Sequence, residues 1–293
     1  TLEGARLYQE TVAGLTGILQ QKTELQSILQ PRIKKAQKRA TSSALLHFRA
    51  FFDDRLVQLD RHLASAKMEA ALALEETLRG SFINMEKEFP GTSGHFNQIL
   101  KRLHFLKDRA DRAASLQQQL RGQFLAVPSH SGWFMMKTEV SQEFYVAIMD
   151  TPNPSRSKGI GLPVESVSHI NAQEFAVRAG WLLGMRAQLP DLEHFQSATG
   201  PTSTFGDILL ESSTGTVPVA GGRPGPHGFI HLWGNVSEWL AASKVDSLGK
   251  ASHVGGHFLD TQEGLFREPV RALNVNDRSR LIGFRVVIKA PVQ

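Results

Sequence analysis

The sequence contains no cysteine in its 293 residues. This absence excludes disulfides, thiolate metal sites and cysteine nucleophiles, but it leaves the compartment open because an exported domain can fold without disulfides. No apolar run approaches the ~20 residues of a membrane-spanning helix, and no signal peptide opens the chain. Because the first residue is Thr1 rather than methionine, we expect a processed product or a piece of a longer protein.

Acidic residues are scarce relative to basic ones in the first part of the chain. Residues 1–125 hold 19 Lys and Arg against 13 Asp and Glu, whereas residues 126–293 hold 14 against 15. The dense basic run, R-I-K-K-A-Q-K-R at residues 32–39, has no interleaved aromatic side chains on which nucleic-acid bases could stack. We therefore interpret it as a solvated helix face, with an anionic membrane surface or an acidic partner as the alternative, and expect no nucleic acid.

Proline is also rare in residues 1–125, which hold only two of the 13 prolines and are rich in helix-forming residues. Pro31 is predicted to kink or break the first helical segment, and the sequence at residues 89–94 is a helix stop. We predict two or three long helices in a hairpin bundle or coiled-coil stalk, through which the chain could form a homo-oligomer. Apolar residues recur every three or four positions, in the spacing of one helix face, at Leu15, Ile18, Leu25 and Ile28, at Leu45, Phe48, Phe52, Leu56, Leu59, Leu63 and Ala66, and at Ile99, Leu103, Leu106, Ala110, Ala113, Leu120 and Phe124.

Residues 126–293 have a different composition, with all four tryptophans and seven of the eleven histidines. Short apolar runs such as residues 133–136 and 281–288 alternate with turn-forming residues. Helices are predicted from Ile170 to about Leu183, and from Asp191, a favourable N-cap, toward Ala198. We expect an α+β domain with much irregular structure, preceded by the helical domain of residues 1–125.

The segment from Gly228 to Trp239 contains the turn Gly234-Asn235-Val236-Ser237-Glu238-Trp239. Gly234 permits a backbone conformation closed to residues with a Cβ, and Asn235 tolerates a left-handed conformation. Trp239 is expected to pack inward, and Glu238 with nearby carbonyls could hold a hard cation.

Six ordered segments of residues 137–288 resemble the formylglycine-generating, or sulfatase-modifying factor, family, whose domain is a variant of the C-type lectin fold. They are Lys137 to Tyr145 (E-V-T-x-x-x-Y in the family), Leu162 to His169 with Ala172 to Phe175 (P-V-x-x-V-S-W and A-x-x-F), Gln188 to Ala198 (R-L-P-T-E-A-E-W-E-Y-A), Gly228 to Trp239 (G-L-Y-D-M-H-G-N-V-W-E-W), Val254 to Phe258 (R-G-G-S-W) and Ile282 to Val287 (G-F-R-V-V). The resemblance implies a C-type-lectin-like domain over residues 126–293.

The departures from the family pattern concern its chemistry. In the aerobic enzymes, two cysteines after the Gly-Gly segment bind copper, and thiolates are the ligands that suit Cu(I). Asp260 and Leu265 lie near those positions here, so formylglycine generation is excluded. The related ergothioneine-type sulfoxide synthases hold iron with His-x-x-x-His-x-Glu and a further histidine. His47, His62, His95 and His104 lack that spacing.

Metal binding has two further candidates. The resemblance implies calcium at Gly234, Val236 and Glu238, although His231 replaces an acidic or amide ligand and a neutral imidazole binds a hard cation poorly. His253, His257 and Asp260, with His231 nearby, are a candidate set for zinc or iron, and we favour a structural role for them. We expect no cofactor, with calcium as the alternative.

The resemblance also places a ligand-binding groove in the last part of the domain. Arg and Asn side chains there could recognise acidic or carbonyl groups of a peptide. Arg285 is expected to be structural, in the closing strand. The candidate groove residues are Trp233, His257, Asp260, Arg267, Arg271 and Asn274.

Three functions remain open from the sequence. We favour a noncatalytic binding, sensory or scaffolding module of a larger bacterial signalling or secretion-associated protein, extracytoplasmic and recognising a peptide, protein or small ligand. The family implies that a kinase or membrane segment could be attached. The first alternative is a cysteine-independent, metal-dependent oxidoreductase, and the second is a helical oligomerisation or partner-binding element with a structural C-terminal domain.

Overall fold

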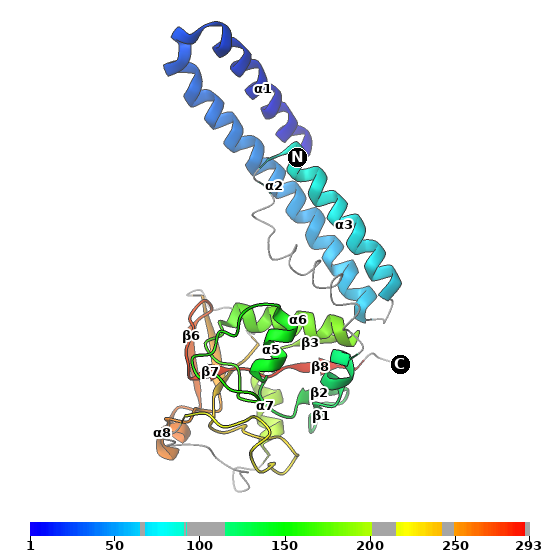
Figure 1. Cartoon of the computed structure of the whole chain (residues 1–293), viewed down its shortest axis with the longest axis vertical. Helices are drawn as coiled ribbons and strands as arrows, with labels where there is room; N and C mark the ends of the chain where they lie inside the picture. The colour runs from blue at the N-terminus through cyan, green and yellow to red at the C-terminus, as the bar shows by residue number, and fades with distance from the viewer. Residues whose placement is uncertain (65–67, 91, 93–114, 201–214, 242–248, 291–293) are drawn as a thin grey trace. The chain divides into compact units, whose positions relative to one another are not determined.

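The computed structural model describes residues 1–64, 68–90, 92, 115–200, 215–241 and 249–290 (Figure 1). The chain forms two compact units, one of Thr1–His62 with Lys67–Asp108 and the other of Leu63–Ala66 with Arg109–Gln293. The predicted boundary after residue 125 stays a prediction. Long N-terminal helices followed by an α+β domain confirm the predicted fold class. Among the described residues, no helix combines the length and the apolar content needed to cross a membrane.

The first unit is built from α1 (Leu2–Gln21), the short helix η1 (Thr23–Leu25), α2 (Gln26–Ala64) and α3 (Met68–Glu88). Helices α1 and α3 both pack along α2 (Figure 1), as the apolar spacing predicted. Phe52 of α2 stacks on Phe82 of α3 with 4.0 Å between ring centroids. The predicted stretch 99–113 lies outside the described residues, and residues 115–121 are helical.

Pro31 was predicted to kink or break the first helical segment; the break was wrong, and the kink stays a prediction. The chain leaves the first helix at Lys22, and Pro31 lies inside α2. Proline removes one amide donor from the helix. Leu29 and Ile33, on either side of it, are 7% and 5% exposed, so their burial offsets the lost hydrogen bond. The predicted stop at Phe89 and Pro90 was correct, because α3 ends at Glu88.

The strands in the described part of the second unit form two small sheets. The first has the order β1 (Phe124–Ala126), β2 (Trp133–Met136), β8 (Val287–Lys289) and β3 (Arg186–Gln188), with antiparallel neighbours throughout. The second has the order β6 (Val270–Asn274), β5 (Lys250–Val254), β4 (Ser237–Trp239) and β7 (Ile282–Gly283), of which β4 and β7 are parallel. The chain therefore crosses from the second sheet to the first at residues 284–286, between β7 and β8.

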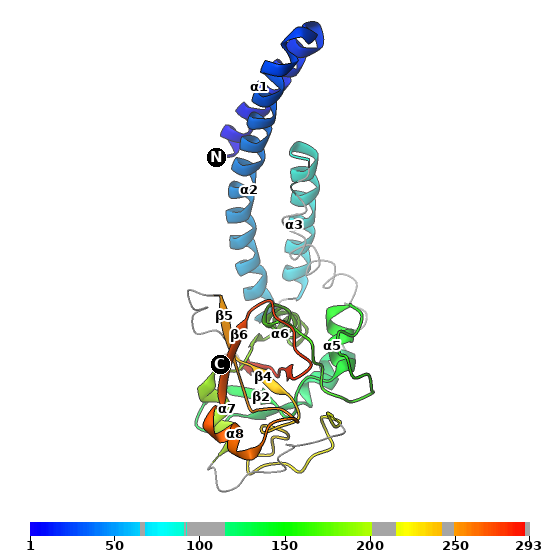
Figure 2. The same ribbon diagram turned by 90° about the vertical axis from the view of Figure 1, so that its left-hand side faces the viewer.

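Besides the helical residues 115–121, the described part of this unit contains the helices α5 (Gln142–Met149), α6 (His169–Leu183), α7 (Leu192–Thr199) and α8 (Gln262–Arg267), shown in Figures 1 and 2. The predicted helices at 170–183 and 191–198 are confirmed as α6 and α7. Asp191 caps α7 as expected, because its side chain accepts a hydrogen bond of 2.8 Å from the His194 amide. Phe175 of α6 stacks parallel to Tyr145 of α5, and Phe284 meets the Phe175 ring edge-on at 5.2 Å.

Candidate functional site

The turn at Gly234 and Asn235 positions the loop that follows β5. Both residues have positive φ, 86° and 56°, as their types predicted. The Gly234 amide donates to the Gly255 carbonyl at 2.7 Å, and the Phe258 amide donates to the Asn235 carbonyl at 3.0 Å. These two bonds hold residues 255–258 against the turn.

Trp239 anchors the end of the same segment. Its side chain is fully buried, which confirms the sequence prediction, and its indole nitrogen donates to the Val167 carbonyl at 2.9 Å. The rings of His169 and His253 each meet it edge-on at 5.6 Å. Trp239 is thus a core residue whose polar atom is satisfied.

Arg285 lies in the crossover between the two sheets and joins them. It forms a two-pronged ion pair with Glu238 of β4, with both nitrogen–oxygen distances 2.6 Å and both side chains fully buried. The same guanidinium donates to the carbonyls of Met136 and Lys137 at 3.2 Å, and to that of Ile230 at 3.0 Å. The structural role expected for Arg285 is confirmed, but it acts outside a strand, because β7 ends at Gly283 and β8 begins at Val287.

A second carboxylate, Glu139, shares the charge of Arg285. It is 1% exposed and accepts a hydrogen bond of 2.9 Å from the Asn235 side chain. The pKa of Glu139 is raised to about 8, chiefly by burial; Arg285 opposes this shift and Glu238 adds to it. Burial raises the pKa of Glu238 as well, with Arg285 opposing the shift. One cation thus faces two buried acids. Because both oxygens of Glu238 accept hydrogen bonds from Arg285, we assign the proton that this pair of acids holds at neutral pH to Glu139. Sequence reasoning missed this role, although Glu139 lies in the first of the six matching segments.

The candidate calcium site shares Glu238 with this ion pair. Both carboxylate oxygens of Glu238 accept hydrogen bonds from Arg285, so a cation at Gly234, Val236 and Glu238 would have to displace the guanidinium. His231, in the position that weakened the prediction, is 4% exposed. The donor set present therefore does not fit calcium well, and we derive no function from it.

The alternative transition-metal site also lacks a ligand cluster. Across the described part of the chain, no group of three or more His, Asp or Glu side chains lies close enough to hold a metal ion. His253 and His257 instead belong to a small polar cluster with Asp260 and Arg271.

This cluster is the part of the predicted groove that the fold assembles. The Arg271 Nη1 atom donates to Asp260 Oδ2 at 3.0 Å, and the same oxygen accepts the His257 amide at 2.9 Å. The three side chains are partly accessible, with exposed fractions of 25% for Arg271, 13% for His257 and 11% for Asp260. His253 lies opposite Arg271 in the pairing of β5 with β6. Asp260 thus stabilises the loop of residues 257–260 and holds the side chain of Arg271 of β6 in place.

Both histidines of the cluster are uncharged at neutral pH. The pKa of His253 is lowered to about 4, chiefly by burial and further by Arg271 and His257, while Asp260 opposes the shift. Burial also lowers the pKa of His257, again opposed by Asp260. The cluster therefore presents a carboxylate–guanidinium pair beside two neutral rings, which suits hydrogen bonding better than proton transfer at neutral pH.

The other predicted groove residues do not join this cluster. Trp233 is half-buried against the core, where it meets the Phe195 ring edge-on at 6.0 Å. Asn274 is exposed, binds Asp277 at 3.2 Å, and lies three positions from Arg271, which places it on the other face of β6. Arg267 ends α8, and its side chain lies outside the described residues.

The two residues near the positions of the family's cysteines, Asp260 and Leu265, have structural roles here. Leu265 is fully buried, and a Cβ on Gly256 would approach its Cδ1 atom to 2.6 Å. Gly256 also has a φ of 70°, a conformation that favours glycine, so both its backbone and the contact with Leu265 disfavour a side chain there. Asp260 is engaged by Arg271. A packed leucine and a paired carboxylate cannot bind Cu(I) as thiolates do.

Comparison with known proteins agrees with this description. Residues 202–290 match the family model of the sulfatase-modifying factor enzyme 1-like domain. No curated protein matches the chain.

Solved structures with a similar region each align with 57% of this chain. Treponema denticola variable protein 1 is 17% identical over 91% of its own chain, with a TM-score of 0.48. CarF is 20% identical over 92% of its chain, with a TM-score of 0.44. PvdO from Pseudomonas aeruginosa is 15% identical over 90% of its chain, with a TM-score of 0.45. In its C-terminal region, over residues 202–290, this chain is thus similar to the sulfatase-modifying factor enzyme 1-like domain, and it has no cysteine.

Proposed function

We propose that the C-terminal unit is a noncatalytic module that binds a peptide or protein partner through the surface around Asp260 and Arg271. The observation that carries the proposal is the replacement of the thiolate positions by buried Leu265 and by an Asp260–Arg271 ion pair. Formylglycine generation of the usual kind is impossible without cysteine. The polar surface that remains is suited to recognition.

The physical basis for binding is a fixed but accessible guanidinium. Asp260 engages Arg271 through Nη1, and the side chain is still 25% exposed. An arginine held in place loses little conformational freedom when it binds a carboxylate or carbonyl group of a ligand. The loop is itself fixed by the Gly234–Asn235 turn, so the surface is preorganised. We extend the proposal to an extracytoplasmic setting within a larger bacterial signalling or secretion-associated protein, on the basis of the sequence resemblance.

A peptide-display selection tests this proposal. Random peptides are selected on the immobilised protein, and their affinities are then measured for the Arg271→Gln variant. We expect a loss of about tenfold or more, because a hydrogen bond to a charged group contributes about 1.5–3 kcal/mol. Arg280→Gln is the matched control, because Arg280 is exposed and lies beyond the end of β6.

Two results would contradict the proposal. Selected peptides that bind the Arg271→Gln and Asp260→Asn variants as tightly as the original protein would place the binding surface elsewhere. Oxidation of a cysteine in a sulfatase-type peptide by the purified protein would show that the domain is catalytic. Tryptophan fluorescence during denaturant unfolding checks that each variant is folded.

A further inference from the structure

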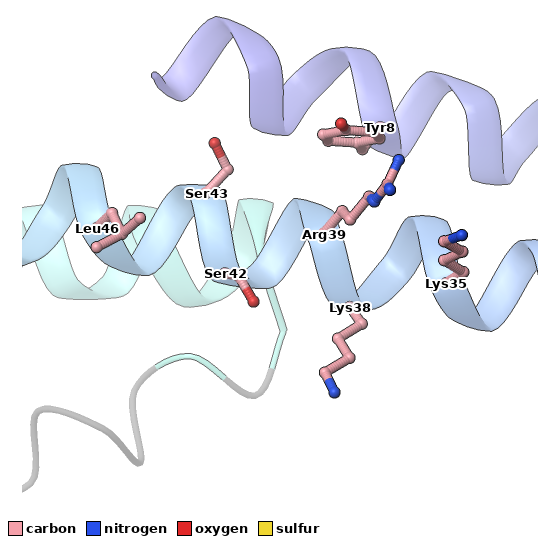
Figure 3. Close-up of a pocket in the computed structure, with 7 residues that line it drawn as sticks. All are labelled: Tyr8, Lys35, Lys38, Arg39, Ser42, Ser43 and Leu46. Atoms are coloured by element: carbon pink, nitrogen blue, oxygen red, sulfur yellow. The ribbon is translucent and has the colours of Figure 1, made fainter.

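A groove on the helical unit is lined entirely by α1 and α2 and has a volume of about 570 Å³ (Figure 3). It is open to solvent and lies along the basic run that the sequence placed on a solvated helix face. The residues that line it are Tyr8, Lys35, Lys38, Arg39, Ser42, Ser43 and Leu46. Three cations and three hydroxyl groups therefore share one hollow.

The cations of this groove have no acidic ion-pair partner among the described residues. Lys35, Lys38 and Arg39 are exposed, and within the described ranges no ion pair to a carboxylate is recorded for any of them. Arg39 instead lies over the Tyr8 ring of α1, 5.8 Å from its centroid. This contact orients the guanidinium at the groove without cancelling its charge. The fold thus supplies an aromatic neighbour that the basic run lacks in the sequence.

The groove changes character along its length. Lys35, Lys38 and Arg39 lie at one end, the serine hydroxyls lie in the middle, and Leu46 lies at the other end with 73% of its surface exposed. From Lys35 to Leu46 the helix rises by ~16 Å. A small anion would use the basic end alone, and an apolar ligand would use only Leu46.

We propose that this groove binds an acidic peptide segment of a protein partner, with its carboxylates at Lys35, Lys38 and Arg39 and an apolar side chain at Leu46. A peptide matches the length and the graded chemistry of the site. In Figure 3, Arg39 extends toward α1, whereas Lys38 extends away from α1. The site is independent of the proposed function of the C-terminal unit.

Fluorescence anisotropy with the full chain tests the proposal. The probe is a fluorescein-labelled peptide with a run of glutamates followed by serines and terminal leucines, and a scrambled peptide of the same composition is compared with it. The groove variant carries Lys35→Gln, Lys38→Gln and Arg39→Gln. The control variant removes the same charge from exposed positions outside the groove, through Lys22→Gln, Arg49→Gln and Lys87→Gln.

We expect the ordered peptide to bind more tightly than the scrambled one. The groove variant should lose about tenfold or more in affinity, because three cation–carboxylate contacts disappear. The control variant should lose less than about twofold, and added salt should weaken binding. Leu46→Ser keeps all charges and is expected to remove the preference for the ordered peptide. Since Leu46 is exposed, that variant stays folded even if the triple variant does not.

Several outcomes would overturn the proposal. Equal losses in the groove and control variants would show attraction to the overall charge of the unit. Equal affinity for the ordered and scrambled peptides would remove the evidence for the graded groove. If neither peptide binds, and phosphatidylserine vesicles bind the original protein but not the groove variant, the basic end binds a membrane surface instead.

Discussion

Replacement of Arg285 by methionine is the sharpest test of how the C-terminal unit is held together. The change removes a fully buried cation and leaves the Glu238 carboxylate without its partner. It also removes the donors to the carbonyls of Met136, Lys137 and Ile230. Breaking one side of a buried ion pair costs about 3–5 kcal/mol, and an unsatisfied buried polar group adds to that loss. We expect the free energy of unfolding to fall by at least this amount.

Guanidinium chloride unfolding, followed by tryptophan fluorescence, measures the loss. All four tryptophans lie in residues 126–293, so the signal reports the C-terminal unit. With a denaturant dependence of roughly 2–6 kcal/mol per molar, a loss of ~4 kcal/mol moves the midpoint by about 1 M. Arg280→Met is the control, because Arg280 is exposed and its replacement should change stability by less than about 0.5 kcal/mol.

The companion variant Glu238→Gln separates an ion pair from a simple packing contact. Arg285 keeps a nearby acid in this variant, because Glu139 can ionise once Glu238 is neutral. We therefore expect Glu238→Gln to cost less than Arg285→Met. A loss below about 1 kcal/mol for Arg285→Met would refute the reasoning, since that is the scale of an exposed pair. Equal losses for the two variants would show that Glu139 does not share the charge.

Two further predictions concern pH. The folded Glu139 carboxyl has a pKa of about 8, whereas the unfolded one ionises near 4.5, so the free energy of unfolding falls as pH rises between these values, by up to about 1.4 kcal/mol per pH unit. When unfolding is measured at a series of pH values, Glu139→Gln should remove this part of the pH dependence. An unchanged pH dependence in that variant would contradict the prediction. The folded His253 ring stays neutral down to a pKa of about 4 whereas the unfolded ring gains a proton near 6.5, so its contribution is lost as pH falls from 6.5 to 4. His253→Phe can keep the edge contact with Trp239 and should reduce the loss of stability between pH 6.5 and pH 4. The same loss of stability in the variant would contradict this prediction.

The local features of the fold could be predicted because they depend on neighbouring residues. The periodic apolar positions gave the long helices, Asp191 gave the start of α7, and Gly234 with Asn235 gave the turn. Pro31 was misjudged because the burial of Leu29 and Ile33 depends on α2 packing, which the local sequence does not show. A propensity of about 3 kcal/mol against proline can be outweighed by such burial.

The candidate site could be predicted only in part. His257, Asp260 and Arg271 do come together, and they do so because β5 and β6 pair in a register that places His253 opposite Arg271. Asn274 was included by closeness in sequence, but the alternation of side chains along a strand places it on the opposite face from Arg271.

The sequence by itself determined what this protein cannot do and what its segments are: without cysteine it has no thiolate chemistry, and its residue spacing sets the helices and turns. Only the tertiary structure decided which distant polar groups meet. Arg285 contacts a carbonyl 149 positions away at Met136, and Tyr8 of α1 meets Arg39 of α2. Helix and strand periodicity extend over a few residues, whereas such contacts depend on where the chain crosses between sheets or helices. Burial at those crossings then decides which charges must be paired.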